Sequence, residues 1–231
     1  MPAPLTPDEL EALRRSSSPT IANAIETFKA HPWNEGFMGP EIRSLFPELP
    51  PMVGYAVTAM IRADVPPAEG HRVPPQDWWD HILTIPAPRI LVMQDLDNPR
   101  PVGAFWGEVQ ANLHRALGCV GAISDGGVRD LEEARRLGFH FCAPRVLVSH
   151  AYVHIVKVGL PVRVGGITVR PGDLLHGDQH GVVHIPDALA RDVAAAAARV
   201  EETERQIIAC CQAPDFTVDK LKEVWKRVRG Y

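Results

Sequence analysis

The sequence predicts an α/β protein whose core is a layered β/β/α domain. Short apolar runs typical of strands alternate with helical segments from residue 54 to residue 143. A block rich in valine, isoleucine and glycine then covers residues 146–185 without a helical segment, and a helical tail follows it. Alternating strands and helices favour a sheet covered by helices, and consecutive strands separated by turns favour a second sheet layer.

The N-terminal part, residues 1–50, is expected to form helices and a proline-rich loop. Thr6 is expected to cap the first helix, because Pro7 suits the first helical position and Glu9 completes a capping box. A second helix begins at Ser18, where apolar residues follow at helical spacing. The prolines beyond it indicate a loop, because proline lacks a backbone donor and fixes φ.

Residues 51–190 are expected to form the β/β/α core domain. Turn signals at Gly165-Gly166 and Pro171-Gly172-Asp173 divide its second half into several strands, partly antiparallel. Its first half contains the alternating elements, with strands at 54–61, 89–93, 120–124 and 140–143 and helices at 76–83, 108–117 and 131–137.

Residues 191–231 are expected to form C-terminal helices. An alanine-rich helix is predicted to open at Pro186-Asp187 and to run to about Cys211, because alanine has the highest helix propensity. A last helix is predicted over residues 215–229, where apolar residues fall on one face.

Composition and charge exclude several classes of partner. At 231 residues, with 45% hydrophobic and 23% charged residues, the chain is ordinary for a soluble globular protein. Its net charge of −4 leaves no footprint for nucleic acid or an anionic membrane, and no apolar run approaches a membrane span of roughly 18 residues. The N-terminus does not look like a secretory signal, and the four cysteines match neither a zinc pattern nor a disulfide framework. We therefore expect a cytoplasmic protein with neither nucleic acid nor membrane as its partner.

The segment Asp125-Gly126-Gly127-Val128-Arg129-Asp130 carries the clearest chemistry, and it follows an apolar strand. Glycine permits tight or left-handed backbone where a loop approaches a ligand. Arginine offers a planar fork to a carboxylate or enolate oxygen, and aspartate offers a hard oxygen to a cation such as magnesium. Arg129 and Asp130 therefore predict a site for a small anionic substrate held against a metal.

A second segment, Trp106-Gly107-Glu108-Val109-Gln110, opens a helix in the same way. Loops at neighbouring strand ends of a mixed α/β sheet converge on one ligand, and the amides at a helix start bind anions. We expect the backbone amides of Gly107, Glu108, Val109 and Gln110 to receive a carboxylate, while the Glu108 side chain reaches toward the metal.

Each of these side chains also has a simpler interpretation. Glu108 alone compensates the helix dipole, which is worth about 0.3–1 kcal/mol. Asp130 alone is a plain N-cap worth about 1 kcal/mol, and Arg129 alone is a surface ion pair of little value. Their combination beside a glycine pair favours a site over the three separate interpretations.

Two groups of histidines were weighed as metal ligands. Strand alternation would place His176, Asp178 and His180 on one face, but the glycines between them favour a turn over a metal cluster. His150 and His154 lie four residues apart in strand-like sequence, so helical spacing gives no ligand pair.

Residues 107–130, continuing through Gly138-Phe139 and Pro161-Val162, resemble the family that contains regulator of ribonuclease activity A and the 4-hydroxy-4-methyl-2-oxoglutarate aldolases. The stretch from Gly172-Asp173 to Pro186 matches a later strand pair of that family. The resemblance covers about residues 50–190. It implies a swivelling β/β/α domain that assembles into a homotrimer or homohexamer with active sites at subunit interfaces.

The aldolase branch of this family implies a divalent cation, magnesium or manganese, and a 2-oxo acid substrate that is cleaved to pyruvate. By match to the motif, Asp130 would ligate the metal directly, and Glu108 would support it through water. Arg129 would bind the pyruvyl oxygen, and the amides of Gly107 to Gln110 would bind the pyruvate carboxylate. A metal and an arginine on one oxygen stabilise the enolate that retro-aldol cleavage or decarboxylation leaves.

The resemblance also raises two questions about this particular chain. The aldolase branch uses an acid from the long C-terminal helix of a neighbouring subunit, and Glu201, Glu202 and Glu204 are equal candidates. Gln110 lies where aldolase members more often carry an apolar residue, which affects the choice of substrate.

The function favoured by the sequence is a metal-dependent, pyruvate-forming lyase, either an aldolase or an oxaloacetate decarboxylase. The motif contains no lysine, which argues against a Schiff-base aldolase. The alternative is a non-catalytic regulator that binds a ribonuclease or another protein, although acids at both Glu108 and Asp130 favour a metal. A methyltransferase is disfavoured, because no glycine-rich nucleotide loop follows the first strand.

Overall fold

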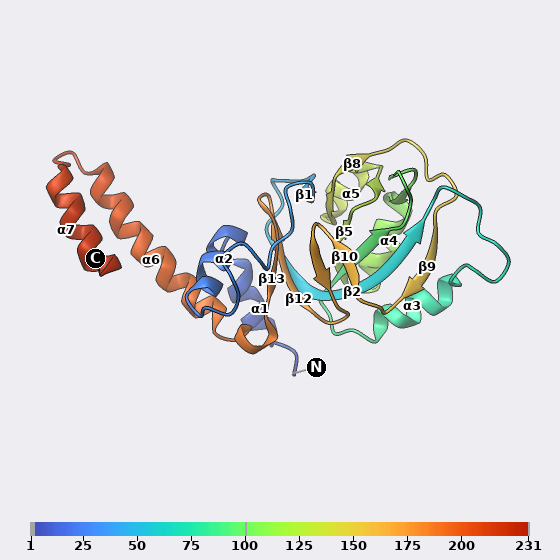
Figure 1. Cartoon of the computed structure of the whole chain (residues 1–231), viewed down its shortest axis with the longest axis horizontal. Coiled ribbons are helices and arrows are strands. Elements are labelled where there is room, and N and C mark those ends of the chain that lie inside the picture. The colour runs from blue at the N-terminus through green and yellow to red at the C-terminus, as the bar shows by residue number, and fades with distance from the viewer. Residues whose placement is uncertain (1–2, 100, 231) are drawn as a thin grey trace.

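A mixed sheet forms the centre of the computed structural model, which describes residues 3–99 and 101–230 (Figure 1). Along this sheet the strands are β1 (Arg43–Ser44), β7 (His140–Ala143), β5 (Cys119–Ser124), β3 (Arg89–Asp95), β2 (Met52–Arg62), β12 (Leu174–Asp178) and β13 (Gly181–Ile185), with β9 (His154–Val158) also paired to β2. Strands β7, β5, β3 and β2 are parallel neighbours, as expected for βα units. The other strands of this sheet pair antiparallel to their neighbours.

Two smaller sheets complete the strand structure of the described residues. Strands β4, β6 and β8 are parallel, and the hairpin of β10 and β11 is antiparallel. Their bounds are β4 (Ala104–Trp106), β6 (Gly127–Val128), β8 (Arg145–Val146), β10 (Val162–Val164) and β11 (Ile167–Val169).

The helices begin close to where the sequence places them. They are α1 (Pro7–Arg14), α2 (Ser18–Glu26), α3 (Pro75–Leu83), α4 (Glu108–Ala116), α5 (Leu131–Leu137), a 3₁₀ turn η1 (Asp187–Leu189), α6 (Val193–Gln212) and α7 (Val218–Arg229). The predicted capping box of α1 is present, with the Thr6 hydroxyl on the Glu9 amide and the Glu9 carboxylate on the Thr6 amide. Local capping chemistry therefore sets the first helix start.

Both faces of the central sheet are buried. On β2, Val53 and Val57 point into one hydrophobic cluster while Met52 and Ala56 point into the other, as the two-residue period of a strand requires. Residues of α1 to α6 fill the first cluster, and residues of the β10–β11 hairpin fill the second. The predicted α/β class with a layered β/β/α core is therefore confirmed.

The long alanine-rich helix starts later than predicted. The prediction that it opens at Pro186-Asp187 is wrong, because the chain first makes η1 and the α-helix begins only at Val193. Pro186 stands in the N-cap position of this turn, and proline has no side-chain acceptor to cap a helix there. The last helix is also shorter than predicted, because the Thr217 side chain caps it on the Lys220 amide.

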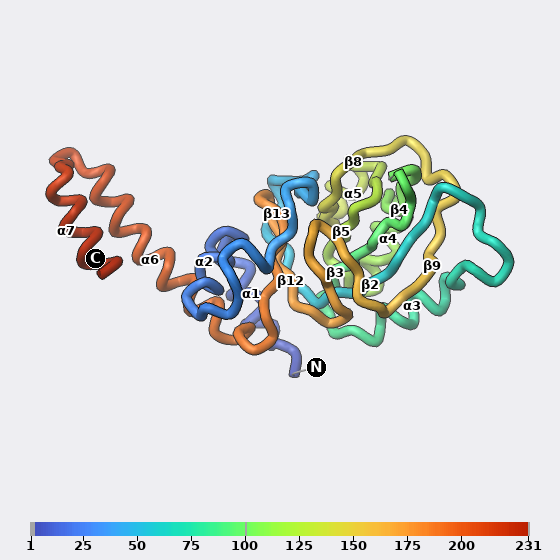
Figure 2. Tube along the Cα trace, in the orientation of Figure 1, coloured from blue at the N-terminus to red at the C-terminus, as the bar shows by residue number. Residues whose placement is uncertain are grey.

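Helices α6 and α7 form an arm that leaves the rest of the chain (Figure 2). The first turns of α6 bury Val193, Ala196 and Ala197, and α6 packs beside α2. Beyond them α6 extends outward and α7 folds back along it, with no buried residue on α7. None of the helices in the described residues is long and apolar enough to cross a membrane.

Candidate functional site

Strands β4 and β6 bring the two polar segments together. Val128 of β6 pairs with Trp106 of β4, and the Arg129 N–H donates to the Trp106 carbonyl at 2.9 Å. The start of α4, at Gly107 and Glu108, therefore lies beside the start of α5, at Arg129 and Asp130. This is the convergence that the sequence predicts for neighbouring loops at strand ends.

Asp130 holds the N-terminus of α4 rather than that of its own helix. It precedes α5 in the N-cap position, yet its side chain makes no capping bond to α5. Instead its Oδ2 accepts a hydrogen bond from the Glu108 N–H at 2.9 Å. Asp130 takes left-handed backbone angles, φ 54° and ψ 50°, which cost a non-glycine residue about 1 kcal/mol or more. The simple N-cap interpretation of Asp130 is therefore wrong.

Gly107 leaves the space that the Asp130 carboxylate occupies. A Cβ atom built at Gly107 would lie 2.5 Å from Asp130 Oδ2 and 3.1 Å from Arg129 Cγ. The Arg129 guanidinium is also close, with its Nε 3.6 Å from the same Oδ2. Glycine at position 107 thus allows a carboxylate and a guanidinium to approach the first turn of α4.

The glycine pair allows close packing and has no left-handed backbone. Neither Gly126 nor Gly127 has a positive φ, so of the tight or left-handed backbone expected in this loop, the left-handed form is absent at both positions. A Cβ at Gly127 would collide with Cδ1 of Leu147, so glycine here lets the Leu147 side chain pack against the backbone of the motif. The left-handed position of the motif is Asp130 itself.

Most of the predicted site residues line one cavity of about 360 Å³. Five of the six predicted residues line this cavity: Gly107, Val109, Gln110, Arg129 and Asp130. The exception is Glu108, whose exposed side chain is not part of the lining and whose backbone N–H is occupied by Asp130.

The amides at the start of α4 are only partly available to an anion. Asp130 uses the N–H of Glu108, so the expectation that all amides from Gly107 to Gln110 receive a substrate carboxylate is too broad. The N–H groups of Val109 and Gln110 have no hydrogen-bond partner among the described residues. Since the first amides of a helix lack intrahelical acceptors, these two are the ones open to a ligand.

Aromatic side chains also line this cavity. Trp78 and Trp79 of α3 and Phe105 of β4 line it, and Trp78 is otherwise buried. The Trp78 indole N–H donates to His114 Nε2 at 2.8 Å, and His114 Nδ1 donates to the Gln110 carbonyl at 2.7 Å. Burial lowers the pKa of His114 from 6.5 to about 4, so the ring is neutral and serves as this acceptor. His114 thereby ties Trp78 to α4.

The donor set fits a hydrated hard cation better than a protein cage. The Asp130 carboxylate lines the cavity, and only its Oδ2 has hydrogen-bond or ion-pair partners among the described residues. No cluster of three or more His, Cys, Asp or Glu side chains suited to a metal occurs in the described ranges. Magnesium keeps several waters and needs only one or two protein carboxylates, so Asp130, with Glu108 as an outer partner, suits it.

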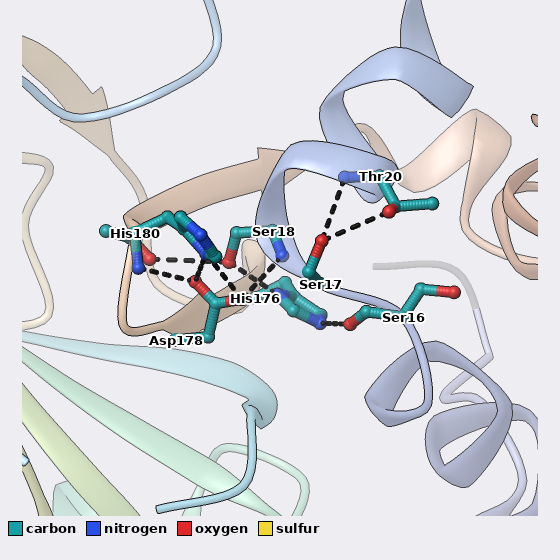
Figure 3. A network of polar contacts seen from close by, with 8 residues as sticks. Ser16, Ser17, Ser18, Thr20, His176, Asp178 and His180 are labelled. Carbon is teal, nitrogen blue, oxygen red and sulfur yellow. Dashed lines mark hydrogen bonds and ion pairs between the residues drawn. The ribbon is translucent and has the colours of Figure 1, made fainter. Parts of the chain in front are cut away.

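The group formed by His176, Asp178 and His180 is a structural clamp (Figure 3). Asp178 accepts hydrogen bonds at 2.8 Å from the backbone N–H of Ser18 and from that of His180. His176 accepts from the Ser18 hydroxyl at 2.9 Å and donates through Nε2 to the Ser16 carbonyl at 3.1 Å. The group therefore ties the start of α2 to the β12–β13 hairpin.

The titration of this clamp agrees with a structural role. Burial lowers the pKa of His176, so the ring is neutral and matches its donor and acceptor contacts. Burial alone would raise the pKa of Asp178, but hydrogen bonds from Ser18 and His180 bring it below its usual value. Both residues have their polar atoms engaged within the chain, as buried polar groups do when they stabilise a fold.

The acids of α6 lie far from the cavity of their own chain. The Ser16 hydroxyl donates to Glu201 at 2.9 Å, and the Asn23 amide donates to Glu204 at 3.4 Å. Glu202 instead pairs with Arg205 on the exposed side of the helix. None of the three lines the 360 Å³ cavity.

Sequence reasoning missed the residues that close the far side of the cavity. Arg72, His150, Val153 and His154 line it, although they lie in segments without a recognisable motif. The chain between β8 and β9 brings the histidines there, because the Ala104 N–H donates to the Ser149 carbonyl at 3.0 Å. Strand-like sequence around His154 predicted β9, but nothing local to it predicted the cavity.

Comparisons with known proteins agree on the type of fold. Residues 19–184 match the model of a protein family described as RraA-like, Aldolase/RraA. An uncharacterized protein from Pseudomonas syringae superposes with a TM-score of 0.73 at 23% identity, covering 96% of this chain and 95% of that one. Streptomyces coelicolor RraAS2, described as an unusual member of the RNase ES inhibitor RraA protein family, superposes with a TM-score of 0.69 at 21% identity, covering 88% and 96%.

Among curated sequences, a putative 4-hydroxy-4-methyl-2-oxoglutarate aldolase from Halalkalibacterium halodurans is 32% identical over 91 residues. The matched stretch is 39% of this chain and 43% of that relative, so it spans less than half of the relative's length. An uncharacterized protein from Methanocaldococcus jannaschii is 28% identical over 134 residues, which are 57% of this chain and 64% of that relative.

Proposed function

Because this chain belongs to the RraA-like, Aldolase/RraA family, we propose that it is a divalent-metal-dependent lyase that cleaves a 2-oxo acid to pyruvate. One observation carries the proposal. Arg129, Asp130 and the start of α4 line one cavity, with the Asp130 carboxylate held on the Glu108 amide. A fixed carboxylate, a guanidinium and open amides together suit an anion with two adjacent oxygen functions, such as a 2-oxo acid.

The roles of the residues follow from their chemistry. Magnesium or manganese, when bound at Asp130, supplies Lewis-acid stabilisation of a developing negative charge. Arg129 donates to the 2-oxo oxygen and holds the charge that collects there as the enolate forms. The amides of Val109 and Gln110 bind and orient the substrate carboxylate. Trp78, Trp79 and Phe105 give the cavity an apolar part of its lining.

The cavity also argues against covalent catalysis through a Schiff base. No lysine is among the described residues that line it. The reaction is instead a cleavage beside a stabilised carbonyl, for which 4-hydroxy-4-methyl-2-oxoglutarate and oxaloacetate are the two substrate types. In the first the bond between C3 and C4 breaks by retro-aldol cleavage, and in the second by decarboxylation. Both leave the enolate of pyruvate.

We further propose that the working form is a homo-oligomer, a trimer or a hexamer, whose sites lie at subunit interfaces. Asp130 and Glu108 are the only protein carboxylates assigned to the cation, and Glu108 contributes no side chain to the cavity lining. An acid from a neighbouring α6 would complete the set. Glu202 is the one of the three candidates that makes no hydrogen bond to the N-terminal segment of its own chain among the described residues.

The experiment uses protein that has been stripped of metal with a chelator. It is incubated with oxaloacetate and with 4-hydroxy-4-methyl-2-oxoglutarate, with and without magnesium or manganese, and pyruvate is read with a coupled dehydrogenase. The metal-only rate is subtracted. Metal-dependent pyruvate formation that Asp130→Ala abolishes and Asp219→Ala, on exposed α7, retains supports the proposal. Absence of both pyruvate formation and metal binding would instead favour the non-catalytic, protein-binding branch.

A further inference from the structure

We propose that His154 is the proton-transfer residue of this site. It takes the proton of the substrate hydroxyl during cleavage and returns it to the pyruvate enolate. This inference rests on the proposed function and adds to it, because that function assigns the carboxylates of Asp130 and Glu108 to the cation and uses Arg129 as a charged donor, which leaves the proton to another group that lines the cavity.

The position of His154 is well defined. It is the first residue of β9 and pairs with Arg62 of β2, and its side chain is 6% exposed. Its Nδ1 lies 2.8 Å from the carbonyl oxygen of Tyr152. A carbonyl only accepts, so Nδ1 carries a proton in this contact, and in the neutral ring Nε2 is then the basic nitrogen. The fold thus fixes both the orientation and the tautomer of this ring.

The basic nitrogen belongs to a ring that lines the cavity. Nε2 of His154 has no hydrogen-bond partner among the described residues. Nε2 of His154 is also not fully enclosed, unlike Nδ1 of His140, which is buried without a hydrogen-bond partner. The small exposed surface of His154 therefore includes Nε2, and the cavity that His154 lines is the one containing Arg129 and Asp130.

The segment that carries His154 is anchored to the strand leading into α4. The Ala104 N–H donates to the Ser149 carbonyl at 3.0 Å. A Cβ at Gly103 would collide with the His150 carbonyl oxygen, so the two segments are in close backbone contact. Since β4 continues directly into Gly107, the strand that leads into α4 also holds the chain just before β9, and the pairing with Arg62 of β2 places His154 itself.

The chemistry balances without any further reactant. Nε2 accepts the proton of the C4 hydroxyl, the bond between C3 and C4 breaks, and the C4 oxygen becomes a carbonyl. The electron pair of that bond passes to C3 and the 2-oxo oxygen as the enolate, which Arg129 faces. The imidazolium then gives its proton to C3, which becomes the methyl group of pyruvate, and the neutral ring is restored. General acid–base catalysis of this kind contributes about 10²–10⁴-fold.

The test follows the last step in reverse and needs no aldol substrate. Pyruvate is incubated with the full-length protein and magnesium in D₂O, and exchange of its methyl protons is followed by ¹H NMR above the magnesium-only rate. His154→Asn keeps an amide donor near the Tyr152 carbonyl but removes the base. His154→Gln also removes the base, but with a longer side chain. Both are expected to slow the exchange by about 100-fold or more.

Controls separate a catalytic role from a structural one. Binding of oxalate, a stable mimic of the pyruvate enolate, is measured by calorimetry and is expected to be retained in His154→Asn. The matched variant is His71→Asn, because His71 is exposed, contacts the Glu69 carbonyl through Nδ1 and does not line the cavity. It is expected to exchange at the wild-type rate.

The outcomes distinguish the two proposals. Wild-type exchange rates in both His154 variants would overturn the role of His154 and leave the lyase proposal standing. If both variants lost oxalate affinity as well as proton exchange, the role of His154 would also be overturned, because His154 would then act by holding the site together. A wild-type protein that neither exchanges pyruvate protons nor forms pyruvate would overturn the lyase proposal itself.

Discussion

The carboxylate of Asp130 accepts a hydrogen bond at 2.9 Å from the backbone N–H of Glu108. The residue that precedes α5 therefore caps the N-terminus of α4. This contact joins the two segments of the site. It orients the Asp130 carboxylate, since one oxygen is held on the amide and the other has no partner among the described residues. A carboxylate at a helix N-terminus is also favourably placed against the helix dipole.

The space at Gly107 gives the first prediction. Gly107→Ala would place a Cβ 2.5 Å from Asp130 Oδ2, so the carboxylate must move off the Glu108 amide. We expect pyruvate formation to fall by at least about tenfold, the equivalent of one lost hydrogen bond to a charged group. The rate is measured at saturating metal. Wild-type pyruvate formation in Gly107→Ala would mean that the Asp130 carboxylate does not need its place on the Glu108 amide.

The planar fork of Arg129 gives a second prediction. Arg129→Lys keeps the charge but loses the ability to hold two adjacent oxygens. We expect kcat for pyruvate formation to fall strongly while the protein remains folded, because the interaction grows as the enolate forms. The measurement is steady-state kinetics with metal at saturation. Wild-type kcat and KM in Arg129→Lys would show that Arg129 has a structural role only.

The buried contact between Trp78 and His114 predicts a pH dependence of stability. The folded pKa of His114 is lowered to about 4 from 6.5, so the unfolded state binds its proton first as the pH falls. The stability that His114 contributes is thus complete above pH 6.5 and is lost toward pH 4, with a slope of at most about 1.4 kcal/mol per pH unit.

The variant His114→Gln tests this directly, because its amide oxygen can still accept from the Trp78 indole but does not titrate. Urea unfolding is measured for both proteins between pH 7 and pH 4. We expect the difference in the free energy of unfolding to change across this range, with the wild type losing more. The remaining histidines are common to both proteins and cancel. If the free energy of unfolding had the same pH dependence in both proteins, the lowered pKa of His114 would be contradicted.

The clamp around Asp178 gives a fourth prediction, that Asp178 stabilises the fold and does not bind a metal. Asp178→Asn keeps the shape but loses an acceptor for the Ser18 or His180 amide, so we expect a loss of about 1–3 kcal/mol in the free energy of unfolding. The exposed Asp219→Asn serves as the control and should change stability by less than about 0.5 kcal/mol. A change in metal stoichiometry in Asp178→Asn would show that this group binds a cation after all.

Local patterns predicted the larger elements and the place of the site. The parallel strands are continuous apolar runs because both faces of the sheet are buried, and capping residues mark the start of α1. The short strands β4, β6 and β8 were not predicted, because a strand of two or three residues is too short to show an alternating pattern. Yet β4 and β6 are the elements that bring Gly107 and Asp130 into contact.

The contacts that complete the site depend on residues far apart in the sequence. Asp130 looked like the cap of α5, because nothing near it in sequence reveals that the Glu108 amide lies within reach. His154 looked like an ordinary strand residue, because its relation to the cavity depends on the packing of its segment against β4. Motif and helix-start rules therefore predict residues that line one cavity, while tertiary contacts determine what each side chain touches there.

The most direct test of the central claim is the binding of manganese to protein stripped of metal, followed by the loss of the free Mn²⁺ signal in electron paramagnetic resonance. Oxalate is added to occupy the place of the enolate. We predict one manganese ion per chain, strengthened by oxalate and lost in Asp130→Ala. Equal binding by the wild type and Asp130→Ala, or no binding by either, would contradict the claim that Asp130 and Arg129 form a metal-dependent site for 2-oxo acids.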